Sequence, residues 1–250
     1  MCLLALERQN ARQKEYADVE TSSARYASRF SGPAGDWLLE VQASILRTLL
    51  AGRTEESILD VGGGHAQVAN TLCPLGFKVS VLGSSAICRE RLLPLLHGEN
   101  CSFTAGDLLH TQYADCSFDV VTCLRLIPHC EEWPGLIREL CRVAKDTVIV
   151  DYPASVSLNA LTPLLFRAKR ALERQTTRPY KLFSHRQIAR EFERNGYALS
   201  RRAGEFFLPM VLHRILKAPA LSRVLELPPA ILGLTKLLGS PVLVEMKRRT

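Results

Sequence analysis

A run of glycines behind an acidic residue is the part of this sequence best suited to binding a small molecule. A short apolar stretch leads into Asp60, and Gly62, Gly63 and Gly64 follow it. Glycine reaches positive φ and lets a ligand approach the backbone closely. We therefore expect a strand, a tight turn and a helix start, with the glycines forming a cradle at the carboxyl edge of a parallel sheet.

The spacing within this loop narrows the choice of ligand. A dinucleotide fingerprint would place a third glycine at position 67, where the chain has Gln67, and no Gly-Lys-Ser/Thr of a phosphate loop follows. What remains is Asp-x-Gly-x-Gly, which resembles the first motif of the class I S-adenosylmethionine (SAM) methyltransferases. In that family the glycine turn passes under the amino-acid part of SAM, with the acidic residue nearby. The resemblance implies that SAM is the cofactor.

The expected second strand departs from this family at its end. Family members usually have an acidic residue there that binds the ribose hydroxyls, but this chain has Gly83, or Leu82 in the other register. A carboxylate that accepts two hydroxyl donors is a strong anchor. Without it, Ser84 or Ser85 would have to bind the ribose, or the affinity for the cofactor would be lower. This departure favours a second hypothesis, a methyltransferase-fold binding or assembly protein that has lost turnover.

The third expected strand leads into Asp107 and Leu108, preceded by Gly106. This resembles the family's Gly-Asp pair, in which the Asp contacts the adenine amino group and the next residue packs near the ring. An Asp that only stabilises a turn is the alternative interpretation.

The fourth expected strand and its exit read Phe-Asp-Val-Val-Thr-Cys-Leu-Arg-Leu-Ile-Pro-His, over 118–129. This resembles the ubiquinone/menaquinone-biosynthesis-like methylases, in which residues at the carboxyl end of this strand line the cofactor. Cys123, Leu124 and Arg125 match those positions. Arg125 would reach the cofactor carboxylate or an anionic substrate group; the alternative is a solvated or capping arginine.

Two residues are candidates for catalysis, and two more for closing the cofactor site. His129 follows the fourth strand and is suited to general base catalysis; the alternative is a structural role, in which it turns the loop into the next helix. Asp151, at the end of the fifth strand, would orient an acceptor hydroxyl or amine, or form a turn before a proline. Tyr26 and Arg29 would close over the cofactor, or belong to a packed lead-in segment.

Periodicity predicts the elements that position these residues. Apolar residues at helical spacing predict a helix from Trp37 to Leu50. Strands are expected over 57–61, 78–82, 101–104, 118–124, 147–150, 197–203 and 241–246, and further helices over 67–75, 85–96, 133–143, 158–173 and 184–195. This alternation predicts an α/β, doubly wound, Rossmann-like sheet, mostly parallel, with helices on both faces. The resemblance implies seven strands, with an antiparallel last strand between the fifth and sixth.

We expect one methyltransferase domain over 1–250. Residues 1–52 would form a helical lead-in or lid, 53–153 the SAM-binding core and 154–250 a C-terminal half. The segment 206–240 is apolar and interrupted by prolines. As an insertion between late strands, it favours a small hydrophobic acceptor, methylated at O, N or C; a cap that buries only its own core is the alternative.

Composition excludes several other classes of protein. The chain has 250 residues, of which 47% are hydrophobic and 23% charged. It has no apolar run long enough for a transmembrane helix or a signal-peptide core. Its eight cysteines include no Cys-x-x-Cys pair, so neither a disulfide framework nor a zinc site is expected. We expect no metal, and a cytoplasmic location.

Charge is distributed unevenly along the chain. The net charge is +7, and residues 151–250 hold 18 Lys and Arg against 7 Asp and Glu. The basic residues form no long run and do not alternate with aromatic residues, so nucleic-acid binding is not expected. A solvated basic face is one interpretation, and contact with a membrane surface beside the apolar insertion is another. No pattern indicates an oligomeric state.

Overall fold

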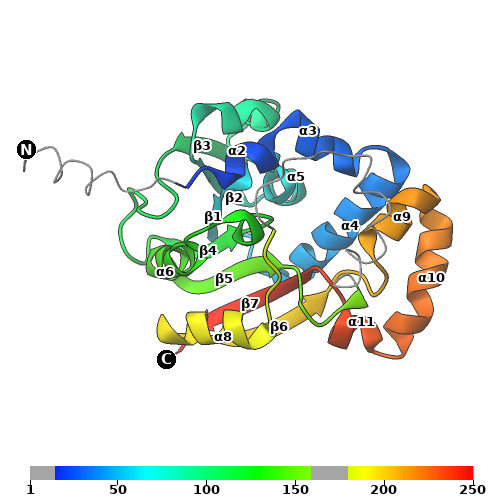
Figure 1. Ribbon diagram of the computed structural model, residues 1–250. Coiled ribbons are helices and arrows are strands. Elements are labelled where there is room, and N and C mark those ends of the chain that lie inside the picture. The colour runs from blue at the N-terminus through cyan, green and yellow to red at the C-terminus, as the bar shows by residue number, and fades with distance from the viewer. Residues whose placement is uncertain (1–14, 159–179, 250) are drawn as a thin grey trace, which may run out of the picture.

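A seven-stranded sheet forms the centre of the computed structural model, which describes residues 15–158 and 180–249 (Figure 1). The strand order is β3-β2-β1-β4-β5-β7-β6. The strands are β1 Ser57–Val61, β2 Lys78–Gly83, β3 Cys101–Ala105, β4 Phe118–Cys123, β5 Ala144–Tyr152, β6 Tyr197–Gly204 and β7 Val242–Arg248. The first five are parallel, and β7 runs antiparallel to both β5 and β6. The expected sheet is confirmed, including the position of the last strand.

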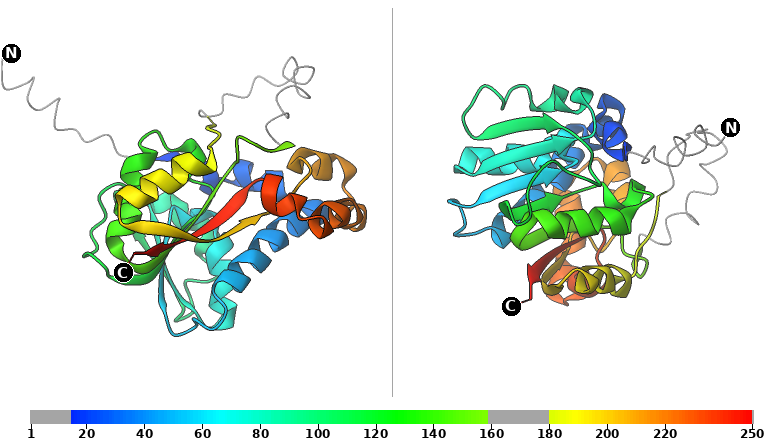
Figure 2. Two further views of the ribbon diagram at one scale, coloured as in Figure 1. Left: turned by 90° about the horizontal axis from the view of Figure 1, so that it is seen from below. Right: turned by 90° about the vertical axis from the view of Figure 1, so that its left-hand side faces the viewer.

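Helices cover both faces of this sheet (Figure 2). The α-helices are α2 Ala17–Ser22, α3 Ala24–Ala27, α4 Gly32–Leu49, α5 Gln67–Leu72, α6 Trp133–Val143, α8 His185–Arg194, α9 Met210–Leu216, α10 Pro219–Ile231 and α11 Leu234–Leu238. On one face, Leu136 and Leu140 of α6 pack with Val121 of β4. On the other, Leu46 of α4 packs with Ile58 of β1. Alternate residues of the buried strands therefore serve two separate cores.

Proline shortens two of the predicted helices. Pro74 follows the end of α5, and the chain continues as a short 3-10 helix, η3 Cys73–Leu75. The helix predicted over 85–96 is instead a 3-10 segment, η4 Ala86–Leu92, with Pro94 two residues beyond it. Proline lacks an amide donor and restricts the preceding residue, so neither helix continues regularly. The helix predicted over 158–173 lies, apart from Leu158, outside the described residues.

The segment between β6 and β7 folds as the three helices α9, α10 and α11, which lie to one side of the sheet (Figure 1). His213 of α9 is fully buried, and its ring lies 5.0 Å from that of Trp37 in α4. The apolar insertion is therefore attached to the face that carries α4. Within the described residues, no helix is long and apolar enough to cross a membrane.

Candidate functional site

The glycine loop after β1 has the turn that its sequence predicts. Gly62 has a φ of 74°, and its N–H donates a 2.8 Å hydrogen bond to the carbonyl of Leu82 in β2. Residues Gly63–His65 then form the 3-10 turn η2, before α5 begins at Gln67. The loop thus follows β1 and is hydrogen-bonded to the end of β2, at the carboxyl edge of the sheet, where ligands bind in open α/β sheets.

Asp60 lies beneath this loop, and only one of its two carboxyl oxygens is hydrogen-bonded within the described chain. Its side chain is fully buried; Oδ1 accepts a 2.8 Å hydrogen bond from Oγ1 of Thr122, and Oδ2 has no partner within the described chain. Burial raises the pKa of Asp60 to about 7, although the Thr122 hydroxyl opposes the shift. An unpartnered buried acceptor beside a positive-φ turn fits the amino-acid part of SAM, so these residues suit the cofactor that the family uses.

The N-terminal helix α2 covers the loop. A Cβ added to Gly64 would lie 2.2 Å from Oγ of Ser22 and 2.6 Å from the carbonyl oxygen of Cys88. A Cβ added to Gly62 would lie 3.5 Å from the Cβ of Asp18. Asp18 and Ser22 are both buried. The space directly above the glycines is therefore filled by side chains of the protein itself.

The carboxylate of Asp18 lies at the end of β2, where the family usually has an acidic residue and this chain has Gly83. This carboxylate accepts a 2.7 Å hydrogen bond from the N–H of Ser84 and a second, short one from the Ser84 hydroxyl. The thiol of Cys88 donates to it as well, at 3.3 Å. Gly83 cannot supply the missing group, because a Cβ there would lie 2.8 Å from that of Cys88 and 3.0 Å from the ring of Phe103. Sequence reasoning missed Asp18, since nothing local marks it.

The Gly-Asp pair after β3 forms a turn. Oδ1 of Asp107 accepts a 2.9 Å hydrogen bond from the N–H of Leu109, as in the alternative interpretation. Leu108 is fully buried in the core. Contact of Asp107 with adenine stays a prediction.

Arg125 is held in an unusual backbone conformation at the end of β4. It has a φ of 60°, a region that residues with a side chain rarely adopt. Its N–H donates a 2.6 Å hydrogen bond to Oδ1 of Asp151, and its guanidinium donates at 2.9 Å to Oε1 of Gln42. The guanidinium also lies over the ring of Phe30, 4.4 Å from its centre. Asp151 thus fixes the turn that aims Arg125 at Phe30.

Asp151 belongs to a buried group of carboxyls that sequence reasoning missed in part. Nε2 of Gln42 lies 3.2 Å from Oδ2 of Asp151 and 2.8 Å from Oε1 of Glu205. Burial raises the pKa of Asp151 to about 6 and that of Glu205 to about 8. Both oxygens of Asp151 are occupied by protein donors, which leaves it poorly placed to accept a proton from an acceptor molecule.

The other predicted residues at this strand end are buried between loops. Cys123 and Leu124 are inaccessible to solvent. The carbonyl of Leu124 is 3.1 Å from Nε2 of His65, whose Nδ1 accepts from the N–H of Gln67. Burial lowers the pKa of His65 to about 3, so this imidazole is neutral and ties the glycine loop to the end of β4.

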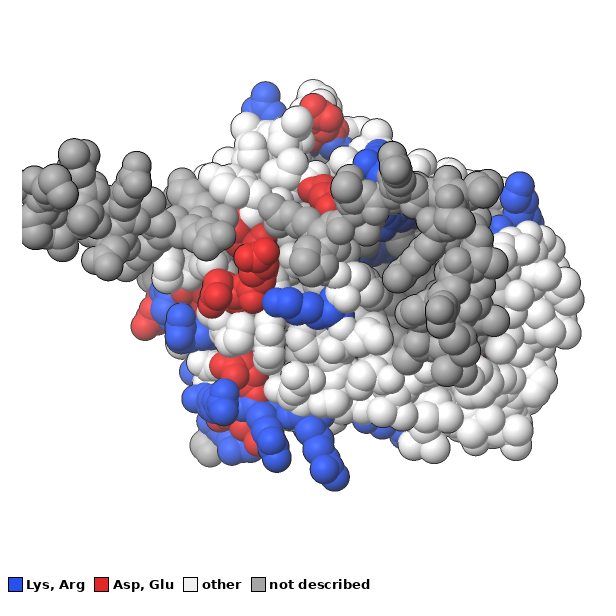
Figure 3. Space-filling model, in the orientation of Figure 1, with Lys and Arg blue, Asp and Glu red and all other residues white. Residues whose placement is uncertain are grey.

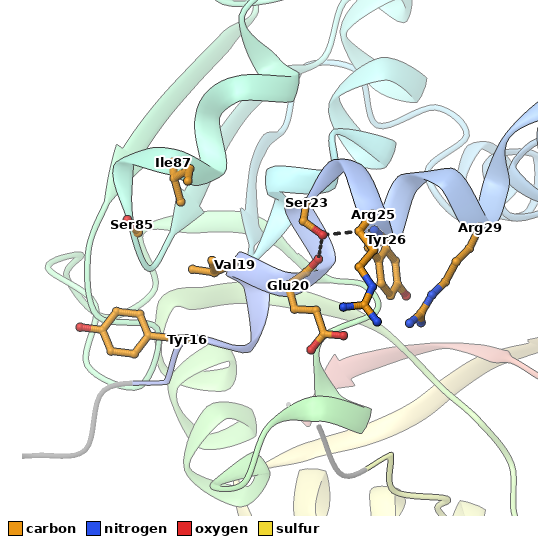
Figure 4. Close-up of a pocket in the computed structure, with 9 residues that line it drawn as sticks. All are labelled: Tyr16, Val19, Glu20, Ser23, Arg25, Tyr26, Arg29, Ser85 and Ile87. Carbon is orange, nitrogen blue, oxygen red and sulfur yellow. Dashed lines mark hydrogen bonds between the residues drawn. The ribbon is translucent and has the colours of Figure 1, made fainter. Parts of the chain in front are cut away.

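Tyr26, Arg29 and His129 meet on the outer side of the same edge. The ring of His129 lies 6.4 Å from that of Tyr26 and 5.5 Å from that of Tyr180. The guanidinium of Arg29 lies 5.0 Å from the centre of the Tyr26 ring. Both residues line a surface hollow of about 650 Å³ (Figure 4), formed by Tyr16, Val19, Glu20, Ser23, Arg25, Tyr26, Arg29, Ser85 and Ile87. The hollow lies beside α2.

Comparison with known proteins shows the family and the fold of this chain. A family model described as a methyltransferase domain matches residues 37–201. No curated protein matches the chain. Among solved structures, magnesium protoporphyrin IX methyltransferase (ChlM) of Synechocystis PCC 6803, with bound SAH, is 15% identical, with a TM-score of 0.60 over 90% of this chain and 92% of that one.

Two further structures have the same fold. The SAM-dependent methyltransferase of Mesorhizobium loti is 14% identical, with a TM-score of 0.58 over 83% of this chain and 98% of that one. The [4+2]-cyclase SpnF is 13% identical, with a TM-score of 0.55 over 82% and 80%. The family model spans more than half of the chain. This chain therefore belongs to the class I SAM-dependent methyltransferases.

Proposed function

We propose that the protein transfers a methyl group from SAM to a small hydrophobic acceptor by in-line displacement. The observation that carries this proposal is the glycine loop over the half-partnered carboxyl of Asp60. SAM supplies an activated methyl group on a sulfonium, so the protein mainly has to align the reactants and exclude water.

In this proposal Gly62, Gly63 and Gly64 would hold the amino-acid part of SAM, and Oδ2 of Asp60 would accept a hydrogen bond from its amino group. Ser84, next to Gly83, binds the ribose. Asp107, Leu108, Cys123 and Leu124 line the adenine side, as the family resemblance implies. Because α2 fills the space above the loop, SAM binds only when Asp18 and Ser22 move away from it.

We propose that Arg125 lies on the acceptor side. Its guanidinium stacks on Phe30, near those of Arg29 and Arg214. None of these three arginines forms an ion pair with an acidic residue in the described part of the chain. Asp151 acts as a positioning residue, because both of its oxygens hold neighbouring groups. His129, between two tyrosine rings, is the candidate general base for an acceptor that keeps its proton near neutral pH.

The acceptor is proposed to be hydrophobic because the insertion 206–240, the lid of the single domain 1–250, presents an apolar surface. A neighbour of the same fold is described as acting on magnesium protoporphyrin IX, a small-molecule acceptor. The seven described cysteines are free thiols, which favours the reducing cytoplasm as the site of the reaction.

The test is calorimetric titration of the purified protein with SAM and with S-adenosylhomocysteine, followed by transfer of labelled methyl groups to hydrophobic phenols and lipids. Micromolar binding that is lost in Gly64→Val supports the proposal. A folded protein that binds neither ligand at millimolar concentration would favour the second hypothesis, a binding protein without turnover. The [4+2]-cyclase neighbour shows that this fold also serves other chemistry.

A further inference from the structure

Helix α10 turns the side chains of Ser222 and Glu226 toward the protein. Ser222 is fully buried, and the carboxylate of Glu226 is mostly covered. Glu226 accepts 2.9 Å hydrogen bonds from the N–H groups of Phe207 and Leu208, and a third contact of 2.9 Å joins it to Nε2 of the buried His213. These polar contacts fix which face of α10 points inward.

The outward face of α10 is apolar. Val224 is 64% exposed and Ile231 75% exposed, with Leu221, Leu225 and Leu232 also exposed at helical spacing around them. A surface helix of a globular protein normally buries its apolar stripe and exposes its polar one. The arrangement in α10 is the reverse, and nothing in the described part of the chain covers this stripe.

The apolar surface continues onto the neighbouring helices. Ile215 at the end of α9 is 64% exposed, and Leu237 in α11 is 60% exposed. Of the sixteen large exposed hydrophobic residues in the described part of the chain, eight fall within 215–237: Ile215, Leu221, Val224, Leu225, Leu227, Ile231, Leu232 and Leu237. Figure 3 shows this side of the molecule, where α9–α11 lie, as mostly uncharged. Contiguous apolar patches of this kind mark interaction surfaces.

The exposed charged residues of the segment 206–240 are all basic. The segment 206–240 contains four basic residues: Arg214 is turned toward the Phe30 ring, and Lys217, Arg223 and Lys236 are exposed. Its single acidic residue is Glu226, which is turned inward. An apolar face bordered by lysine and arginine is complementary to the headgroups and acyl chains of an anionic bilayer.

We propose that α9, α10 and α11 form a peripheral membrane-docking surface that lies in the plane of an anionic lipid bilayer. The exposed leucine, isoleucine and valine side chains enter the boundary between headgroups and acyl chains, and Lys217, Arg223 and Lys236 pair with lipid phosphates. This proposal goes beyond methyl transfer and does not depend on SAM binding.

The position of the docking surface connects it with the acceptor side of the site. Arg214 in α9 places its guanidinium 5.4 Å from the centre of the Phe30 ring, the ring on which Arg125 also stacks. Trp37 and Phe206, 5.3 Å apart, fill the space between α4 and the insertion. An acceptor dissolved in the membrane would therefore approach the protein from the side of Arg125.

The experiment is sedimentation of the full chain with vesicles of phosphatidylcholine and phosphatidylglycerol, and with vesicles of phosphatidylcholine alone. The test variant is Val224→Glu combined with Ile231→Glu, both on exposed positions. The matched control is Leu75→Glu combined with Leu93→Glu, at sites that are 49% and 48% exposed and outside the insertion. Circular dichroism and light scattering establish folding and oligomeric state of each variant.

We expect the wild type and the control to bind the anionic vesicles and the test variant to bind at least about tenfold more weakly, since two inserted carboxylates remove apolar burial and add repulsion. Arg223→Gln with Lys236→Gln should reduce binding to anionic vesicles selectively. A wild type that does not bind them, or equal binding by the test variant, overturns the proposal. So does a dimer that the test variant dissociates without any vesicle binding, which would make this surface a self-interface. SAM titration is independent of all these outcomes.

Discussion

The replacement Asp18→Asn tests whether Asp18 of α2 opposes SAM binding or contributes to it. Its carboxylate accepts hydrogen bonds from the N–H and hydroxyl of Ser84 and from the thiol of Cys88. If SAM binds only after α2 leaves, these bonds oppose SAM binding, and weakening them should tighten it. If Asp18 instead replaces the ribose-binding acid that is missing at Gly83, the same change should weaken SAM binding. The two roles predict opposite signs.

The magnitude follows from the number and kind of these bonds. Asparagine has nearly the shape of aspartate, but it is neutral and turns an amide toward one of the donors. A hydrogen bond to a charged group contributes about 1.5–3 kcal/mol. Loss of one such contribution shifts the equilibrium between covered and open loop by roughly 10- to 100-fold. Because the apparent Kd varies inversely with the open fraction, the Kd for SAM should fall about tenfold or more.

The assay is calorimetric titration of Asp18→Asn with SAM, beside thermal unfolding of the free protein. We expect a lower melting temperature together with tighter binding. Glu20→Gln, an acid-to-amide change on the same helix, is the matched control. Hydrogen exchange of the α2 amides should accelerate when SAM binds. Weaker SAM binding in Asp18→Asn, or slower exchange in α2, would refute displacement; absence of SAM binding in every variant would refute the cofactor assignment itself.

Three further predictions concern the loop and the buried carboxyls. Gly64→Val should abolish measurable SAM binding and lower the melting temperature, because its side chain would collide with Ser22 and the carbonyl of Cys88; titration of the folded variant checks this. Gln42→Leu should destabilise the protein by about 2–4 kcal/mol in urea unfolding, since it leaves two buried carboxyls without their shared donor. The pKa of Glu205, raised to about 8, means that its neutral form is the one that folding favours, so its contribution to stability is complete below pH 4.5 and is lost as the pH rises through 8. Glu205→Gln should therefore flatten the fall in melting temperature between pH 5 and 8, and an unchanged profile would contradict the burial of that charge.

Local patterns were sufficient for most of the fold. The alternation of apolar strands with amphipathic helices predicted the order of elements, and the helix expected over 184–195 is α8, where the Ser184 side chain accepts from the N–H of Gln187. The errors came from proline, which ended regular helix earlier than the apolar spacing indicated at positions 74 and 94.

Part of the candidate site was predictable from local sequence and part was not. The loop from Asp60 to Gly64 was readable, because its conformation needs glycines at fixed positions in a short segment. Glu205 was not predictable, because no neighbouring residue in the sequence marks it as buried. Its partner Gln42 is distant in the chain and lies beside it only in the folded protein. The roles of His129 and Asp107 stay predictions.

The sequence by itself determined the alternation of strands and helices and the glycine turn, because strand periodicity and positive-φ turns are properties of neighbouring residues. The cofactor class followed from the resemblance of the glycine motif to that of the class I methyltransferases. Only the tertiary structure decided that Asp18 of α2 lies in the corner left open by Gly83. It alone also decided that the apolar stripe of α10 faces outward, because Glu226 is drawn inward by His213 and two backbone amides. Both outcomes depend on contacts between distant segments, and no local pattern specifies which partner a buried carboxylate will find.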